Sequence, residues 1–306
     1  MKVEKELAAF SPQKDMALTI GVFDGVHLGH KYLLSQLRKH AKKEGLLSGV
    51  VTFDKHPTTT LSPEIRQLSL TDLDTRIRLL RNEGIDSVIT LPFTMELARL
   101  SARQFISLLK KHLKLRSMLV GPDFALGRKR EGDIDTIRKL GKEMNFSVIV
   151  IDPLNKDDEV ISSTNIRNAM ALGDIERVTE LTGRPFGLHG RVVTGAGRGK
   201  EMGYPTANLD IDPYQALPPD GVYATRAYID SNAYKSLTNI GRAPTFGATE
   251  RTIEVYIIDY QSNLKGRKLR IDFIKRIREE RQFDNPQQLV QQVTEDVKRG
   301  KAILDS

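Results

Sequence analysis

The first half of the chain alternates between short apolar runs and longer segments whose apolar residues recur every three or four positions. The runs are typical of buried strands, and the longer segments are typical of helices with one buried face. The predicted strands are 17–22, 49–53, 86–91, 117–120 and 146–151, and the predicted helices are 30–43, 72–83, 101–113 and 134–144. This alternation predicts an α/β domain with a doubly wound parallel sheet, whose ligands bind beyond the carboxyl ends of the strands.

After about residue 184 the pattern changes to alternating apolar and polar positions, which is typical of half-buried antiparallel strands. The predicted strands are 187–194, 221–229, 233–240, 252–260 and 268–277, separated by turns that contain Gly and Pro. They predict an antiparallel barrel or sandwich. A closing helix is expected with Asn285 as its N-cap and Pro286 as its first residue. We therefore predict two domains, 1–183 and 184–306.

Composition excludes several classes of protein. The 306 residues include no cysteine, which excludes disulfides and cysteine-ligated zinc. No apolar run approaches the ~18 residues of a membrane span, and the N-terminus lacks an apolar signal core, so we expect a cytoplasmic protein without a membrane partner. The net charge of +8 suits a nucleic-acid surface, phosphate sites or solvated helix faces. Because the basic residues are dispersed, we expect no nucleic-acid partner; a homo-oligomer remains open.

Two histidines, His27 and His30, stand at a predicted strand–helix junction in the segment TIGVFDGVHLGH, residues 19–30. Gly21 and Gly25 allow the backbone to approach a ligand closely, and the N-terminus of the following helix attracts anions. A zinc site would need further ligands close by. The spacing alone also fits ordinary loop histidines, but the setting favours an anion site.

Two further segments leave the predicted parallel sheet. In ISSTNIR, residues 161–167, Ser163 or Thr164 can cap a helix whose first turn presents Arg167, so that these groups converge on phosphate. A plain capped helix is the alternative. In VGPDFALGRKREGD, residues 120–133, Asp123 follows another strand and is placed to contact a nucleotide.

The second half contains a different candidate site. In GAGRGKEMGYPTANL, residues 195–209, Gly197 and Gly199 suit a loop that covers phosphates. If residues 206–208 are extended, Thr206 and Asn208 share one face and offer hard oxygen ligands for Mg²⁺, although PTAN is also typical of a turn. Glu254 alternates with apolar neighbours in TIEVYIID and is either solvent-facing or a partly buried base.

These motifs occur in a fixed order over nearly all of residues 15–300, together with GVYA, NIGRAPTFG and IREERQFDN. The set resembles the family of bacterial bifunctional riboflavin kinase/FMN adenylyltransferases, also called FAD synthetases, and GVFDGVHLGH resembles the signature of the HxGH nucleotidyltransferases. The resemblance implies that the C-terminal domain, expected to be a β-barrel, phosphorylates riboflavin to FMN with ATP. The N-terminal domain then joins AMP from ATP to FMN, which yields FAD and pyrophosphate.

The resemblance also implies roles for residues. His27 and His30 would stabilise the α-phosphate of ATP, and Glu254 would be the general base of the kinase. Mg²⁺ with ATP would be bound by Thr206 and Asn208. Nucleotide and phosphate contacts would come from Gly21, Phe23, Gly25, Asp123, Ser163, Thr164, Arg167, Gly197 and Gly199. The chain departs from residues common in the family at Leu126, Asn165 and Tyr256.

Two alternatives remain at this point. Within enzymes, the chain would retain only one of the two activities. In a different class, it would be a flavin-responsive RNA-binding regulator, which the net charge of +8 permits. Such a regulator would bind RNA with a steep salt dependence and show little turnover. Two complete sets of catalytic motifs in one chain favour the enzyme.

Overall fold

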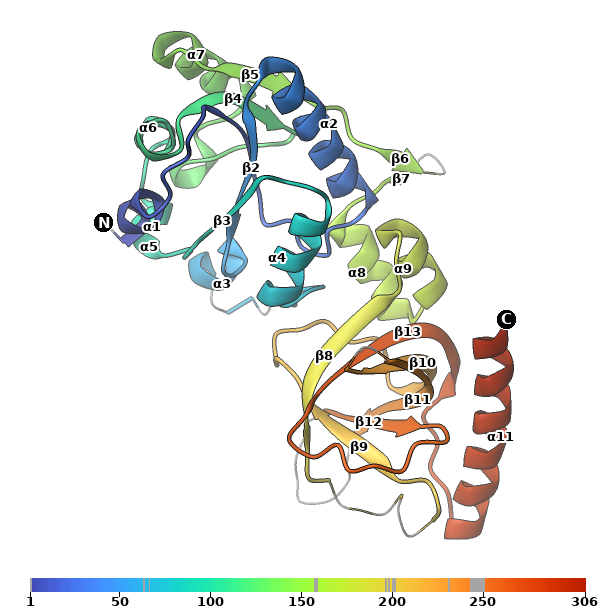
Figure 1. The fold of residues 1–306 in the computed structure, drawn as a ribbon. Helices are drawn as coiled ribbons and strands as arrows, with labels where there is room; N and C mark the ends of the chain where they lie inside the picture. Colours follow the sequence, from blue (N-terminus) through green and yellow to red (C-terminus); the bar gives the residue numbers. More distant parts are fainter. Residues whose placement is uncertain are drawn as a thin grey trace. The chain divides into compact units, whose positions relative to one another are not determined.

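The computed structural model describes residues 2–306 except 63, 66, 157–158, 196, 198, 200–201, 231 and 243–250, and for Arg242 the backbone only. The chain divides into two compact units, Met1–Ser163 and Thr164–Ser306 (Figure 1). This division falls before the domain boundary expected after residue 183, because two helices between these points group with the second unit. That the segments 1–183 and 184–306 each fold and function independently stays a prediction.

The first unit contains a five-stranded parallel sheet with the strand order β3-β2-β1-β4-β5. The strands are β1 (Met16–Ile20), β2 (Leu47–Phe53), β3 (Ser87–Leu91), β4 (Leu115–Val120) and β5 (Ser147–Val150). The chain runs from β1 outward to β3 and then returns to β4 on the other side of β1. The predicted doubly wound sheet is thereby confirmed, with its topological switch point between β1 and β4.

Helices cover both faces of this sheet and bury separate apolar cores against it (Figure 1). One face packs against α1 (Lys2–Ala8), α5 (Met95–Ala98), α6 (Ala102–Leu113) and α7 (Ile134–Met144). The other packs against α2 (Leu28–Glu44) and α4 (Leu73–Asn82). Alternate residues of β1 serve the two cores, with Leu18 on the first face and Ala17 on the second. Such continuous apolar strands are what a doubly covered parallel sheet requires.

The second unit contains a closed antiparallel barrel with the strand order β10-β11-β12-β9-β8-β13. Its strands are β8 (Phe186–Val193), β9 (Thr206–Asp210), β10 (Gly221–Ile229), β11 (Asn232–Arg242), β12 (Arg251–Ile257) and β13 (Lys268–Glu279). Its helices are α8 (Ser163–Leu172), α9 (Ile175–Thr182) and α11 (Pro286–Asp305). Helix α9 packs on β8 and β13, and helix α11 packs on β10, β11 and β13. The barrel alternative is confirmed, and Asn285 caps α11 as predicted.

Several boundaries and short elements differ from the sequence-based expectation. The strand expected at 17–22 ends at Ile20, because Phe23 turns into the left-handed region with φ = 55°. The strand expected at 252–260 ends at Ile257. Several elements were not predicted from the sequence: the helices α1, α3 (Pro57–Leu61), α5 and α9, the pair β6 (Asn155–Lys156) and β7 (Glu159–Val160), and the 3₁₀ turn at Arg128–Arg130. Among the described helices, none is long and apolar enough to cross a membrane.

Candidate active sites

The loop between β1 and α2 has an unusual backbone. Phe23, Gly25 and Val26 have φ values of 55°, 80° and 37°. Residues other than glycine rarely adopt such positive φ values. At residues other than glycine, here Phe23 and Val26, such conformations cost of order 1–3 kcal/mol each and cluster at functional sites. The strained turn ends at His27, the N-cap of α2. It therefore places both histidines at the positive end of a 17-residue helix, at the switch point of the sheet.

The two imidazoles form a rigid pair. Their rings stack with centroids 3.6 Å apart and planes 20° apart, and Nδ1 of His27 accepts the backbone N–H of His30 at 3.3 Å. Because Nδ1 is an acceptor, the proton of neutral His27 resides on Nε2. Phe23 closes the other side of the pair, with its ring centroid 5.1 Å from that of His30.

His30 is half-buried, with its Nδ1 closed off from solvent, and its ring is electrically neutral in the free chain at neutral pH. Burial lowers its pKa well below 6.5, and the neighbouring His27 lowers it further. Its Nδ1 has no hydrogen-bond partner among the described residues. An anionic oxygen that binds beside this ring would raise the pKa of the imidazole. The pair is thus suited to an anion, and the described residues contain no group of three metal-ligating side chains.

Close packing around Gly29 leaves no room for a side chain at this position between the two histidines. A Cβ at this position would lie 2.9 Å from the carbonyl oxygen of Ile161 and 3.1 Å from Nδ1 of His27. Ile161 opens the segment ISSTNIR, and the hydroxyl of Ser163 in that segment donates to the carbonyl oxygen of Asp24 at 2.9 Å. The start of ISSTNIR is therefore held against the histidine loop.

Thr164 and Arg167 lie in α8 and belong to the second unit. Their convergence with the histidines on one phosphate stays a prediction. Gly21 lies beside the Phe23 ring, where a Cβ would be 3.2 Å from Cε2 of that ring.

The barrel brings together the residues predicted for the second site. β9 pairs with β12, so that Asn208 lies opposite Glu254 and Thr206 lies opposite Tyr256. The hydroxyl of Thr206 donates to Oε2 of Glu254 at 3.3 Å. Ile253 and its alternate neighbours along β12 are buried, whereas Glu254 is half-buried on the opposite face. The sequence-based condition of an extended PTAN segment is met, and the three polar groups share one face.

The glycine-rich segment before β9 is only partly described. Gly197 has φ = 76°, and no atom of the described residues beyond its chain neighbours lies within 4 Å of the place that a Cβ would occupy. The N–H of Tyr204 donates to the carbonyl oxygen of Gly199 at 2.8 Å. A Cβ on Gly195 would overlap the side-chain amide of Asn208. The phosphate-covering role of this loop stays a prediction. Residues 243–250, which hold most of NIGRAPTFG, lie outside the described residues.

Comparison with known proteins decides the family. The FAD synthetase family model matches residues 10–165, and the riboflavin kinase model matches residues 182–304. The bifunctional riboflavin kinase/FMN adenylyltransferase of Escherichia coli (strain K12) is 35% identical over 288 residues, which cover 94% of this chain and 92% of the relative. The Bacillus subtilis (strain 168) enzyme of the same name is 32% identical, with 93% and 91% covered. The chain belongs to the bifunctional riboflavin kinase/FMN adenylyltransferase family.

The fold is shared with a solved structure. The crystal structure titled as a macrolide-efflux protein from Streptococcus pneumoniae is 30% identical, with a TM-score of 0.89 and coverage of 98% of this chain and 97% of that chain. The histidine pair thus lies in the FAD synthetase domain, and Glu254 lies in the riboflavin kinase domain.

Sequence reasoning missed Asp24, the residue that anchors the histidine loop of the FAD synthetase domain. Its side chain is 3% exposed, and its carboxylate accepts the N–H of Leu70 at 2.9 and 3.0 Å and that of Thr71 at 3.2 Å. The Thr71 hydroxyl in turn accepts the N–H of Gly25 at 3.2 Å. An acid inside an apolar, glycine-rich loop was the available signal. Its partners are backbone groups far along the chain, which no local pattern identifies.

Asp123 lies where β4 ends in the FAD synthetase domain. It is exposed, and with Phe124 and Arg130 it lines a pocket of about 400 Å³. The Arg130 guanidinium donates to the Asp123 carbonyl oxygen at 2.9 Å. Leu126, one of the departures from the family pattern, instead packs in the core and pairs with Gly132 through backbone hydrogen bonds. Its side chain is therefore structural.

Proposed function

We propose that this chain makes FMN from riboflavin and ATP in its riboflavin kinase domain, and FAD from FMN and ATP in its FAD synthetase domain. The observation that carries the second step, the formation of FAD, is the stacked His27–His30 pair at the N-terminus of α2. Nδ1 of His30 has no hydrogen-bond partner among the described residues. Family membership supports both reactions and the use of ATP.

In the FAD synthetase domain, a phosphate oxygen of FMN attacks the α-phosphorus of ATP. The bond from this phosphorus to the bridging oxygen breaks, and pyrophosphate leaves. No covalent enzyme intermediate is needed, so catalysis consists of positioning and charge stabilisation. His27 donates from Nε2, and His30 acts beside it as charge builds on the α-phosphate oxygens.

Residues of the loops around the histidines make the remaining contacts with the nucleotide in this step. Gly21, Phe23 and Gly25 form the wall beside the histidines, and Asp123 approaches from β4. Ser163, Thr164 and Arg167 bind the outer phosphates, where hydroxyls and a guanidinium suit anionic oxygens.

In the riboflavin kinase domain, Glu254 accepts the proton of the ribityl 5′-hydroxyl as that oxygen attacks the γ-phosphorus of ATP, and ADP leaves. Thr206 and Asn208 hold Mg²⁺ with ATP. Their hydroxyl and amide oxygens are hard donors on the same face as the carboxylate, which fits this ion. Bound there, Mg²⁺ supplies positive charge to the phosphates. Gly197 and Gly199 belong to the loop that covers them.

The test is incubation of the purified chain with riboflavin, ATP and MgCl₂, followed by chromatographic separation of flavins. We expect FMN to form first and FAD to follow, with FAD alone when FMN is supplied in place of riboflavin. Absence of both products would overturn the proposal. Salt-sensitive RNA binding without turnover would support the regulator instead.

A further inference from the structure

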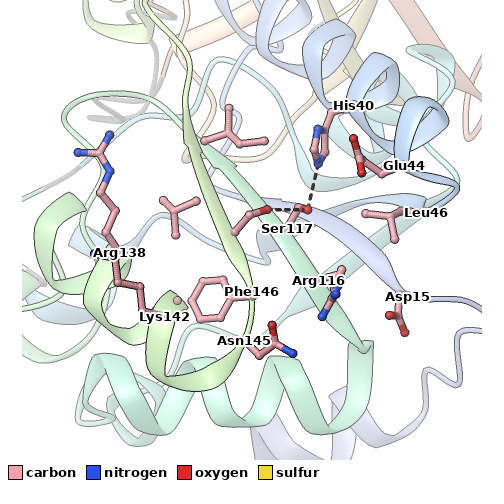
Figure 2. A pocket seen from close by; sticks show the side chains of 14 residues that line it. Asp15, His40, Glu44, Leu46, Arg116, Ser117, Arg138, Lys142, Asn145 and Phe146 are labelled. Carbon is pink, nitrogen blue, oxygen red and sulfur yellow. Dashed lines mark hydrogen bonds between the residues drawn. The ribbon is translucent and has the colours of Figure 1, made fainter.

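A second large pocket lies in the first unit, at the edge of the sheet where its strands begin. It has a volume of about 1020 Å³ and is lined by residues of α2, β4, α7 and β5 and by the residues just before β1, β2 and β5 (Figure 2). His27 follows the carboxyl end of β1, whereas Asp15 of this pocket precedes its amino end. A five-residue strand spans ~17 Å, so the pocket and the histidine pair are separate sites.

An irregularity in the sheet places a cation in this pocket. Met16 pairs with Leu115 and Ala17 pairs with Ser117, so Arg116 is an extra residue of β4 without a partner on β1. Such bulges are rare between parallel strands, and they re-aim side chains beside functional sites. Arg116 is exposed and lines the pocket. Among the described residues it makes no ion pair, and neither does Lys142.

The floor of the pocket is a fixed chain of hydrogen-bonding groups. Nε2 of His40 lies 3.0 Å from the hydroxyl of Ser117, to which the Ser147 hydroxyl donates at 2.9 Å (Figure 2). Ser117 is 4% exposed and lies directly opposite Ser147 in the pairing of β4 with β5. His40 and the exposed Ser147 therefore present polar atoms to the pocket, and the hydrogen bonds to Ser117 hold these atoms in place.

Charges of both signs line the pocket, and Asp15 and Arg116 lie on the same side of it as Glu44 (Figure 2). Arg138 and Lys142 lie on one side of the Phe146 ring, and Glu44 lies on the other side near His40 (Figure 2). The ion pairs of Arg138 and Glu44 are exposed contacts with neighbours on their own helices, at 3.8 and 4.0 Å. Basic residues near helix C-termini often serve only to offset the helix dipole. That explanation covers Lys142 on α7 but not Arg116, which is on a strand.

We propose that this pocket binds a nucleoside phosphate at a site distinct from both active sites. The phosphate lies between Arg116 on one side of the pocket and Arg138 and Lys142 on the other, since guanidinium groups match phosphate oxygens in geometry and charge. The sugar hydroxyls lie toward Glu44 and His40, because a carboxylate is a common partner for a ribose hydroxyl. The half-buried apolar side chain of Leu46, which also lines the pocket, contacts the base. The volume lies at the upper end of the range for small-ligand pockets.

The test is a site-resolved titration of the full-length chain with AMP, followed by the backbone amide NMR signals of Ser117 and Ser147. We expect saturable shifts at both residues. The double variant Arg116→Gln/Lys142→Gln should weaken the apparent affinity at these signals at least ~10-fold, as for loss of hydrogen bonds to a charged group. The matched variant Lys139→Gln removes an exposed cation of α7 outside the pocket lining and should leave it unchanged.

Separate titrations with inorganic phosphate and with adenosine measure how much of the affinity for AMP comes from the phosphate group and how much from the nucleoside. Each should bind more weakly than AMP at Ser117 and Ser147. The proposal is overturned if AMP shifts only signals near Gly29 and His30, or if the double variant binds AMP as the wild type does. It is also overturned if inorganic phosphate alone binds as tightly as AMP.

Discussion

Nδ1 of His27 accepts the backbone N–H of His30 at 3.3 Å, and the two rings stack 3.6 Å apart. One interaction thereby caps α2, fixes the tautomer of His27 and aligns the second ring. The arrangement directs Nε2–H of His27 away from its own helix. It is a preorganised donor pair, which is what stabilisation of a charged transition state requires.

Replacement of either histidine should impair only the second reaction. His27→Ala or His30→Ala removes a side chain that we propose stabilises the α-phosphate, so FAD formation should fall by ~10²-fold or more. FMN formation from riboflavin should be unchanged in the same preparation. Both rates are measured by flavin chromatography. Wild-type FAD synthesis in both variants would refute the role, and a chelator-sensitive bound metal would instead support a metal site.

The depressed pKa of His30 predicts a pH dependence of stability. Below pH 6.5 the unfolded chain takes up a proton on this imidazole, whereas the folded chain does not until a lower pH. The folded state therefore loses stability as the pH falls below 6.5, by up to about 1.4 kcal/mol per pH unit. Urea unfolding at pH 7.5 and 5.5 should show a smaller loss for His30→Gln than for the wild type. Equal losses would contradict the neutral imidazole.

Asp24 should act as a positioning residue for the histidine loop. Asp24→Asn puts an NH₂ group where one carboxylate oxygen accepts the N–H of Leu70, which costs about 1–3 kcal/mol. We expect lower stability to urea and slower FAD formation, with FMN formation kept. Asp72→Asn is the matched control, because Asp72 caps α4 through Thr75, and asparagine caps equally well. An equal effect of the two substitutions on FAD formation would argue against positioning.

Glu254→Gln tests whether Glu254 is the proposed general base of the kinase reaction. The amide keeps the size of the side chain and can still accept the Thr206 hydroxyl, but it cannot take a proton from riboflavin. FMN formation should therefore fall at least ~10²-fold while ATP binding, measured by calorimetry, is largely retained. Near-normal FMN production would rule Glu254 out as the base.

The domain boundary can be tested with two fragments. Residues 182–306 should fold and make FMN but no FAD, as the change of pattern near residue 184 predicts. Residues 164–306 should do the same with higher stability, because α9 packs on β8 and β13, and Glu176 pairs with Lys275 at 2.8 Å. Thermal unfolding and FMN assays of both fragments decide this. An inert but folded 164–306 fragment would contradict independent function.

Local patterns in the sequence sufficed for most of the fold. Helical periodicity identified α7 at its observed bounds, and the segment that begins at Ser101 forms α6, where Ser101 and Gln104 make a capping box. Both signals depend on residues within one or two turns. The short helices α1, α3 and α5 were missed because four to seven residues carry too little periodicity.

Non-local contacts were the part that the sequence did not provide. The motifs identified His27 and Glu254 as candidates, but the adjacency of Glu254 to Thr206 depends on the pairing of β12 with β9. The Asp24 anchor depends on backbone groups of residues 70–71, and the position of Arg116 depends on a bulge against β1. Pairing and register between distant strands have no local signature.

The central claim is that one chain holds two chemically separate active sites. It is tested most directly by assaying His27→Ala and Glu254→Gln in parallel, each with riboflavin and with FMN as the starting flavin. We predict that His27→Ala accumulates FMN at the wild-type rate and makes little FAD, whereas Glu254→Gln makes little FMN but converts supplied FMN to FAD normally. Loss of both reactions in each folded variant would contradict the account.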